Sequence, residues 1–191
     1  MSMKKFICML GVLILIFNLG GCSFLIRNSL QSQSRPTEAD AKKLVESMTQ
    51  NVLNALDEKN AEKLENSFSK KAFVESNDMD KGAYYTVNLF CGSNAVIDKD
   101  GTSYREYTEK GKIKRTANAF YIVRTDQGQF SIYFEYCFFS DFSPDDVGIY
   151  SFKLTDYEKA KDIEDFDYQN RSDRAGIYHP GWDEEVIGES E

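Results

Sequence analysis

Residues 129–141 read QFSIYFEYCFFSD, and the alternation within them decides the fold class. One set of alternate positions carries large apolar residues: Phe130, Ile132, Phe134, Tyr136 and Phe138. The other set is more polar: Ser131, Tyr133, Glu135, Cys137 and Phe139. A period of two predicts a β-strand with one buried face, which we expect to lie under helices, and one partly open face.

Similar segments precede and follow this strand. The expected strands are residues 83–91, 94–98, 102–109, 112–125, 129–141 and 147–155. Short polar or glycine-containing turns at residues 98–101, 109–111 and 126–128 separate neighbouring strands, and turns of this length join antiparallel strands. The sequence therefore predicts an antiparallel meander.

Two helices are expected before the sheet. Thr37 and Asp40 have the spacing of a capping box, and apolar residues then recur at steps of three and four over residues 41–56. Asn60 is expected to cap a second, shorter helix that carries Leu64 and Phe68. The predicted fold class is α+β, with two N-terminal helices packed on a curved antiparallel sheet.

The first residues have the features of an export signal. Lys4 and Lys5 precede an apolar run, residues 6–17, that is shorter than a membrane-spanning helix. The run ends at Leu19-Gly20-Gly21-Cys22, which resembles the lipobox of bacterial lipoproteins. The resemblance implies cleavage between Gly21 and Cys22 and lipid, palmitate included, on the Cys22 thiol. We expect this anchor to hold the protein on the extracytoplasmic face of the cell membrane.

These patterns divide the chain into four parts. Residues 1–21 are the predicted signal peptide, residues 22–36 a lipidated flexible tether, residues 37–155 the α+β domain, and residues 156–191 an acidic C-terminal tail. Ile177, Tyr178 and Trp182 form an apolar group in this tail that is expected to dock only marginally. The whole chain has a net charge of −8 at pH 7, which argues against nucleic acid as a partner.

Catalytic and metal-binding motifs are missing from the sequence. The one histidine, His179, has no nucleophile beside it, and residues 98–101 lack the later ligands of a calcium loop. We therefore expect no catalytic residue, no metal and no cofactor. Cys91 and Cys137 could form a disulfide outside the cell, but their apolar surroundings favour two free thiols.

The second strand face is the expected binding face. It brings together Tyr133 and Glu135 of one strand with Lys153 of another. Glu135 is expected to pair with a cross-strand base, either Lys153 or Arg124, and so to have a structural role.

Five stretches resemble the lipoproteins of domain-of-unknown-function family 5104, found mostly in Gram-positive bacteria. They are residues 55–60, 119–121, 125–128, 132–136 and 147–150. The resemblance covers about residues 37–155 and implies the cone-shaped fold of the nuclear transport factor 2-like (cystatin-like) superfamily. It implies no activity, because that superfamily contains both enzymes and binding domains.

The expected function is a non-catalytic binding or interaction module of the cell envelope. Its partners would be the membrane, through the lipid on Cys22, and an unknown envelope protein or ligand. Two alternatives from other classes stay open at this point: a small-molecule enzyme that uses the interior of the cone, and an immunity-type protein that neutralises a secreted toxin.

Overall fold

The computed structural model describes residues 35–160 and 174–178. Every element below belongs to the compact unit that begins at Thr37. The predicted signal peptide, the cleavage site at Gly21 and Cys22, His179 and Trp182 all lie outside the described residues.

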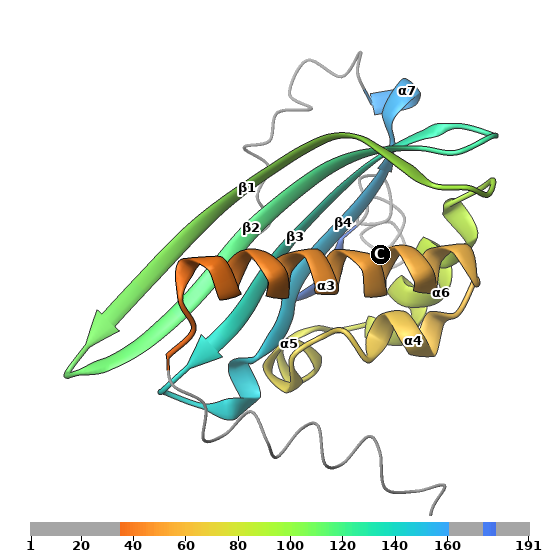
Figure 1. Cartoon of the computed structure of the whole chain (residues 1–191). Helices are drawn as coiled ribbons and strands as arrows, with labels where there is room; N and C mark the ends of the chain where they lie inside the picture. Colours follow the sequence, from red (N-terminus) through yellow and green to blue (C-terminus); the bar gives the residue numbers. More distant parts are fainter. Residues whose placement is uncertain (1–34, 161–173, 179–191) are drawn as a thin grey trace, which may run out of the picture. The chain divides into compact units, whose positions relative to one another are not determined.

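The chain has an α+β fold in which helices precede a five-stranded sheet, as the sequence predicts (Figure 1). The helices are α3 (Glu38–Asp57), α4 (Ala61–Glu65), α5 (Lys70–Glu75) and α6 (Met79–Leu89), with the short α7 (Tyr157–Ala160) after the fourth strand. The strands are β1 (Val96–Glu109), β2 (Lys112–Arg124), β3 (Gln129–Ser140), β4 (Gly148–Asp156) and β5 (Gly176–Tyr178), and a 3₁₀ turn, η2 (Pro144–Asp146), precedes β4.

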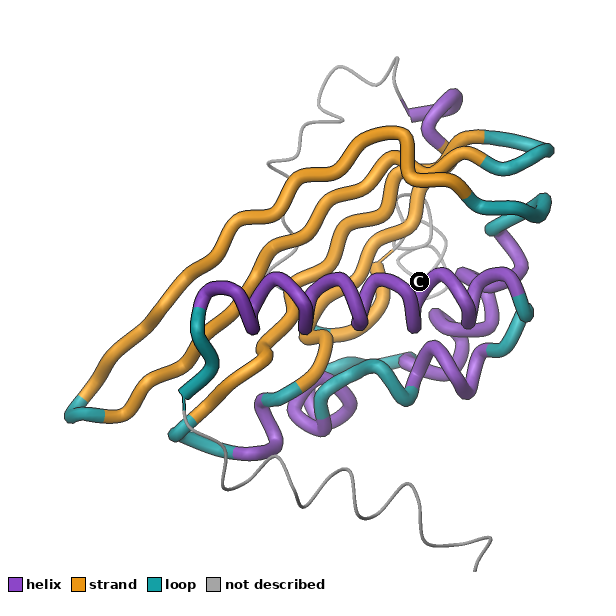
Figure 2. The backbone as a smooth tube through the Cα atoms, in the orientation of Figure 1, coloured by secondary structure: helices purple, strands orange, loops and turns teal. Residues whose placement is uncertain are grey.

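Helix α3 begins where its sequence predicts. The Thr37 hydroxyl accepts a hydrogen bond from the Asp40 backbone N–H at 3.2 Å, and the Asp40 carboxylate accepts one from the Thr37 N–H at 2.9 Å. These reciprocal bonds are a capping box, which satisfies N–H groups that the helix itself leaves unpaired. From this start α3 runs across the sheet, with the strands bending beneath it (Figure 2).

The sheet has the order β1-β2-β3-β4-β5, and its first four strands form the predicted antiparallel meander. The apolar face of β3 lies under the helices, as predicted, since all five of its alternating residues are buried in the core: Phe130, Ile132, Phe134, Tyr136 and Phe138. Phe134 and its cross-strand partner Phe152 are almost wholly buried at the centre of the core. The apolar face of β3 therefore packs the sheet against the layer of helices.

The region between the first helix and the sheet is more helical than expected. One helix was predicted there and three are present, and the strand predicted over residues 83–91 is wrong because these residues belong largely to α6. The buried residues of α6 include Met79, Ala83, Thr86 and Val87, which are spaced as one face of a helix. Tyr84 and Tyr85 favour strands by themselves, but this apolar face packs α6 into the core.

The turn predicted at residues 98–101 is also wrong, because β1 runs without interruption from Val96 to Glu109. The pairing of β1 with β2 shifts at Asp98, which is the position of a bulge. Both carboxylate oxygens of Asp98 accept hydrogen bonds from the Arg124 guanidinium, at 2.9 and 3.0 Å. This two-point contact holds the Asp98 bulge against the end of β2.

Part of the segment that was assigned to the acidic tail is a strand. Residues 176–178 form β5, which pairs in parallel with β4. Ile177 packs against the core, and a Cβ atom added at Gly82 of α6 would lie 2.9 Å from the Ile177 Cβ. Residues 176–178 therefore lie against the domain, where a glycine in α6 lets the strand approach closely, and the expectation that this docking is only marginal stays a prediction.

We expect Ile177→Ala to lower the free energy of unfolding by about 1–2 kcal/mol, since it removes a half-buried side chain between β5 and α6. Val74→Ala is the matched control, because Val74 is 85% exposed and its loss should change stability by less than about 0.5 kcal/mol. Chemical denaturation measures both variants. Equal effects would mean that β5 adds nothing to the stability of the domain.

Candidate functional site

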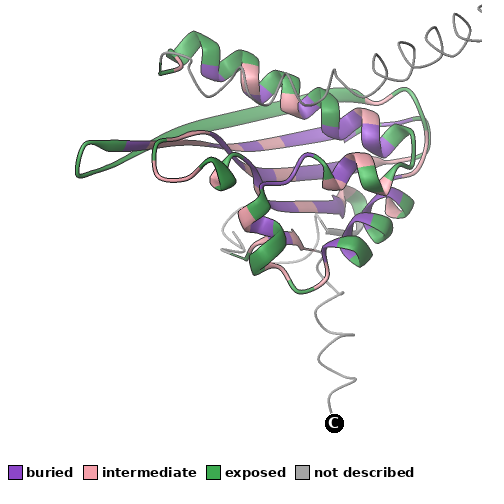
Figure 3. Cartoon of the chain, turned by 90° about the horizontal axis from the view of Figure 1, so that it is seen from below, coloured by how far each residue is buried: buried purple, intermediate pink, exposed green. Residues whose placement is uncertain are grey.

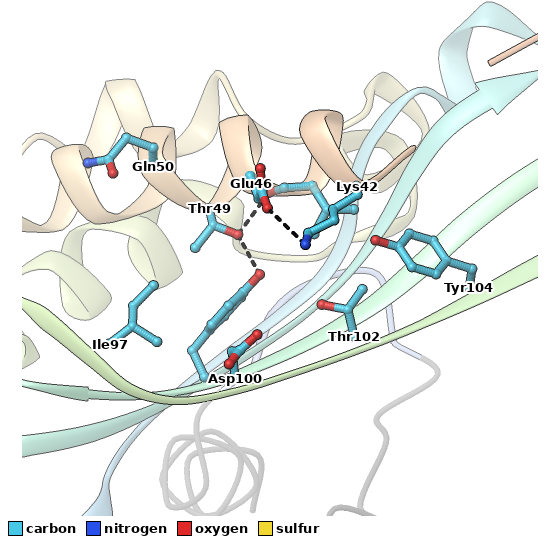
Figure 4. A pocket seen from close by; sticks show the side chains of 10 residues that line it. Lys42, Glu46, Thr49, Gln50, Ile97, Asp100, Thr102 and Tyr104 are labelled. Carbon is cyan, nitrogen blue, oxygen red and sulfur yellow. Dashed lines mark hydrogen bonds and ion pairs between the residues drawn. The ribbon is translucent and has the colours of Figure 1, made fainter. Parts of the chain in front are cut away.

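An open groove of about 540 Å³ lies between α3 and β1 on the inner face of the sheet (Figure 4). Helix α3 contributes Lys42, Val45, Glu46, Thr49 and Gln50, the strand β1 contributes Ile97, Asp100, Thr102 and Tyr104, and β2 contributes Tyr121. The α3 residues lie on one side of the helix because they are spaced by three or four positions.

The groove exists because β1 extends past the part of the sheet that the helices cover. All residues of β1 are exposed, whereas the facing residues of β2, such as Ala117 and Ala119, are fully buried (Figure 3). The inner face of β1 is thus left open toward α3, and polar side chains there remain in contact with solvent.

A buried hydrogen bond between Thr49 and Tyr121 closes the inner side of the groove. The Thr49 hydroxyl lies 2.8 Å from both the Val45 carbonyl oxygen and the Tyr121 hydroxyl. A threonine hydroxyl has one proton, so donation to the Val45 carbonyl leaves it to accept the proton of Tyr121. The Tyr121 ring is thereby fixed as part of the groove wall.

Charged groups of both signs line the outer part of the groove. The Lys42 ammonium lies 3.9 Å from the Glu46 carboxylate (Figure 4), and Asp100 is the cross-strand partner of Tyr121. Although Tyr104 is 40% exposed, the partial burial of its phenol raises its pKa, and the nearby Tyr121, Glu46 and Glu38 groups raise it further. The Tyr104 phenol therefore stays neutral at physiological pH and can donate a hydrogen bond.

The predicted binding residues Tyr133, Glu135 and Lys153 lie together, on the opposite face of the sheet from the groove. Tyr133 is directly across from Lys153 in the β3–β4 pair, and its hydroxyl donates to the Asn118 side chain at 3.2 Å. The Lys153 ammonium lies 5.5 Å from the centre of the Tyr178 ring of β5, and burial lowers its pKa. The three residues are partly buried rather than fully open.

The predicted ion pair of Glu135 is wrong. Its neighbours across the strands are Asn118 and Ser151, and Arg124 binds Asp98 instead. Glu135 forms no ion pair with any of the described residues. The register explains this outcome, since Lys153 lies opposite Tyr133 and not opposite Glu135.

Cys91 and Cys137 are free thiols, which confirms the preferred prediction. Cys137 is buried, and its thiol donates a hydrogen bond to the Phe139 carbonyl at 3.4 Å, whereas Cys91 is only half-buried. Burial raises the pKa of the Cys137 thiol from 9.0 to about 11.

We expect Cys137 to make folding sensitive to alkaline pH. Its raised pKa means that the unfolded chain loses this proton first, so stability is complete below pH 9 and falls as pH rises toward 11, by up to about 3 kcal/mol. The free energy of unfolding of Cys137→Ala should fall less between pH 9 and 10 than that of the Cys91→Ala control. Parallel curves for the two variants would contradict this effect of burial.

Within residues 35–160 and 174–178, no group of histidine, cysteine and carboxylate side chains is arranged to hold a metal ion. A helix with the length and apolar character needed to cross a membrane is likewise missing from the described part of the chain.

The protein is of the α+β class, because a long capped helix packs on a mostly antiparallel five-stranded sheet. A groove of mixed polarity lies beside the first strand. The chain belongs to the family described as Domain of unknown function (DUF5104), which matches residues 51–161. The match confirms the family predicted from the sequence, and it includes β1 to β4 with Tyr133, Glu135 and Lys153. A search of curated proteins found no match.

The sequence kept the interior of the cone only as the site of an alternative, enzymatic function, and no groove residue was predicted to bind a ligand, although one signal for the groove is present. Thr49 interrupts the apolar face of α3 between Val45 and Val52, at a position that should otherwise pack into the core. A polar residue at such a position needs a hydrogen-bond partner or an opening beside it, and Thr49 has both.

Proposed function

We propose that this protein is a non-catalytic binding module of the cell envelope. In this proposal the lipid on Cys22 anchors it to the extracytoplasmic face of the membrane, and the groove between α3 and β1 holds its ligand. The proposal includes the nuclear transport factor 2-like form of the α+β fold, in which a helix and a curved sheet enclose a cone.

The observation that supports the proposal most strongly is the composition of the groove. Its volume of about 540 Å³ falls in the range of small-molecule sites. Two tyrosine rings, Val45 and Ile97 offer apolar contact, while side chains of both charges can orient polar groups. Such a lining suits a small molecule that has an apolar surface and several hydrogen-bonding groups.

The geometry favours recognition over catalysis. Thr49 and Tyr121 are bound to each other, so neither hydroxyl is activated by a neighbouring base. The pKa of Tyr104 is raised away from neutrality, which makes its phenol a poorer general base near pH 7. Fixed donors and acceptors of this kind orient a ligand without transferring its protons.

We expect Thr102→Trp to fill the groove and Ser103→Trp to leave it open, because adjacent residues of β1 point to opposite faces of the sheet. Ligand-observed NMR with a small-molecule fragment library would measure binding to residues 22–191 carrying Cys22→Ser. Fragments that bind this protein should lose at least about tenfold in affinity with Thr102→Trp and keep it with Ser103→Trp.

The proposal for the groove fails if no fragment binds the parent protein, or if the two tryptophan variants bind equally well. The outer face with Tyr133, Glu135 and Lys153 stays a prediction for contact with an envelope protein. Lys153→Ala tests that face separately, since its side chain lies on the other side of the sheet.

A further inference from the structure

Strand β1 is an edge strand with exceptional exposure. Every residue from Val96 to Glu109 is exposed, and within the described part of the chain β1 pairs only with β2 (Figure 3). Ile97, Tyr104 and Tyr107 are among the large exposed apolar side chains of the protein. A long edge strand with apolar side chains is a template for pairing with another strand.

We propose that β1 pairs with β1 of a second copy of this chain, in antiparallel orientation about a twofold axis at Tyr104. The two five-stranded sheets would then form one continuous sheet across the dimer. This proposal concerns the edge of the sheet and does not depend on the identity of the groove ligand.

Symmetry restricts the registers that such a pair can have. Residues directly opposite each other in an antiparallel pair have side chains on the same face of the sheet. In a symmetric pair of β1 strands, two residues that lie opposite each other must therefore belong to the same face of β1. Past the bulge at Asp98 the strand alternates regularly, with Asp100 and Tyr104 toward the groove and Lys99 and Glu109 on the outer face. The axis must then pass at a residue and not between two residues.

Charge excludes the registers nearest to the one proposed. An axis at Ser103, one residue toward the N-terminus, would put Asp100 opposite Glu106. An axis at Thr102, two residues toward the N-terminus, would put Lys99 opposite Arg105. An axis one residue from Tyr104 toward the C-terminus would put Arg105 opposite its own copy. Like charges directly opposite each other destabilise a pair of strands.

The axis at Tyr104 instead places Lys99 opposite Glu109 on both sides of the dimer, which is a pairing of opposite charges. This axis lies at the middle of the regular stretch from Lys99 to Glu109, so the whole stretch is paired. An axis at Gly101 also avoids like charges, but it would pair only residues 99–103 of the regular stretch.

The remaining side chains fit this register on each face. On the outer face, the Tyr107 ring lies opposite Gly101, whose missing side chain leaves room for an aromatic ring. On the inner face, Glu106 lies opposite Thr102, whose hydroxyl can donate a hydrogen bond to the carboxylate. Because Thr102 lines the groove, Glu106 of the second copy would extend the groove across the axis.

The test is a charge exchange in residues 22–191 carrying Cys22→Ser, studied by sedimentation equilibrium. Lys99→Glu and Glu109→Lys each place like charges opposite each other at two symmetric sites, so each should weaken the dimer at least about tenfold. The double variant again places opposite charges at positions 99 and 109 of the two copies, so it should recover the dimer. Within one chain Glu109 already accepts a bond from Tyr107 at 3.0 Å, and circular dichroism would check that each variant keeps its fold.

A parent protein that stays monomeric up to about 100 μM would overturn the proposal, since specific dimers have dissociation constants well below this value. A dimer that neither single variant weakens, or that the double variant does not restore, would also overturn it. Either result would place the contact at another surface or in another register.

Discussion

Cys22→Ala should abolish attachment of lipid, so that the protein remains as unprocessed precursor or appears in the medium. The substitution removes the thiol that the lipobox resemblance identifies as the acceptor. Each buried methylene of an acyl chain contributes about 0.8 kcal/mol to membrane binding, so loss of two or more chains removes nearly all of the anchoring free energy. Labelling with a radioactive fatty acid and separation of membrane and medium would measure the result.

Cys8→Ala is the matched control, because Cys8 lies in the apolar run of the predicted signal peptide and should be removed with it. This variant should keep its label and its place in the membrane fraction. Full labelling of Cys22→Ala would refute the assignment of Cys22 as the lipid anchor. The proposals for the groove and the dimer would still stand, because neither depends on the lipid.

Gly148→Ala should destabilise the domain by about 3 kcal/mol or more. Gly148 has a φ of +133°, which side-chain-bearing residues rarely adopt, and an added Cβ would lie 2.5 Å from the Ser69 backbone nitrogen. At this position the backbone of β4 meets the segment before α5, where the Ser69 N–H donates to the Ile149 carbonyl at 2.9 Å. The new methyl group would force these backbones apart.

Gly101→Ala is the control for this substitution. Nothing lies within 4 Å of a Cβ added at Gly101, so the change should alter stability by less than about 1 kcal/mol. Thermal unfolding of the two variants beside the parent protein measures the difference. A Gly148→Ala protein as stable as the parent would mean that β4 and the α5 segment can separate without loss.

The sequence predicted those elements in which local and long-range signals agree. Helix α3 has both a capping box at Thr37 and a sustained apolar period, and β3 has both strict alternation and a turn on its N-terminal side. Each was found within about one residue of its expected bounds. Their periodicity reflects burial against the same core.

The elements that were mispredicted lack this agreement. Helix α6 contains Tyr84, Tyr85 and Thr86, which favour strands locally, and only its packing against the core makes it a helix. Strand β1 is exposed on both faces and so has no apolar alternation, while its Asp100-Gly101 pair is typical of a turn. Both depend on contacts that a local pattern does not contain.

The groove could not be predicted for a related reason. Its walls come from residues far apart in the chain, such as Thr49 and Tyr121, and its volume depends on how far α3 lies from β1. The outer-face residues Tyr133 and Lys153 were easier to place together, because a β3–β4 register follows from a short connection.

The order of strands in the sheet has a kinetic consequence. From β1 to β4 each strand pairs with the next one in the chain, so these hairpins can form through local contacts, which favour rapid folding. The parallel strand β5 is different, because it must return from beyond α7 to reach β4 and the glycine of α6. Its docking brings together segments that are far apart in the sequence, which has an entropic cost. We expect β5 to join last, after the core of the domain is already in place.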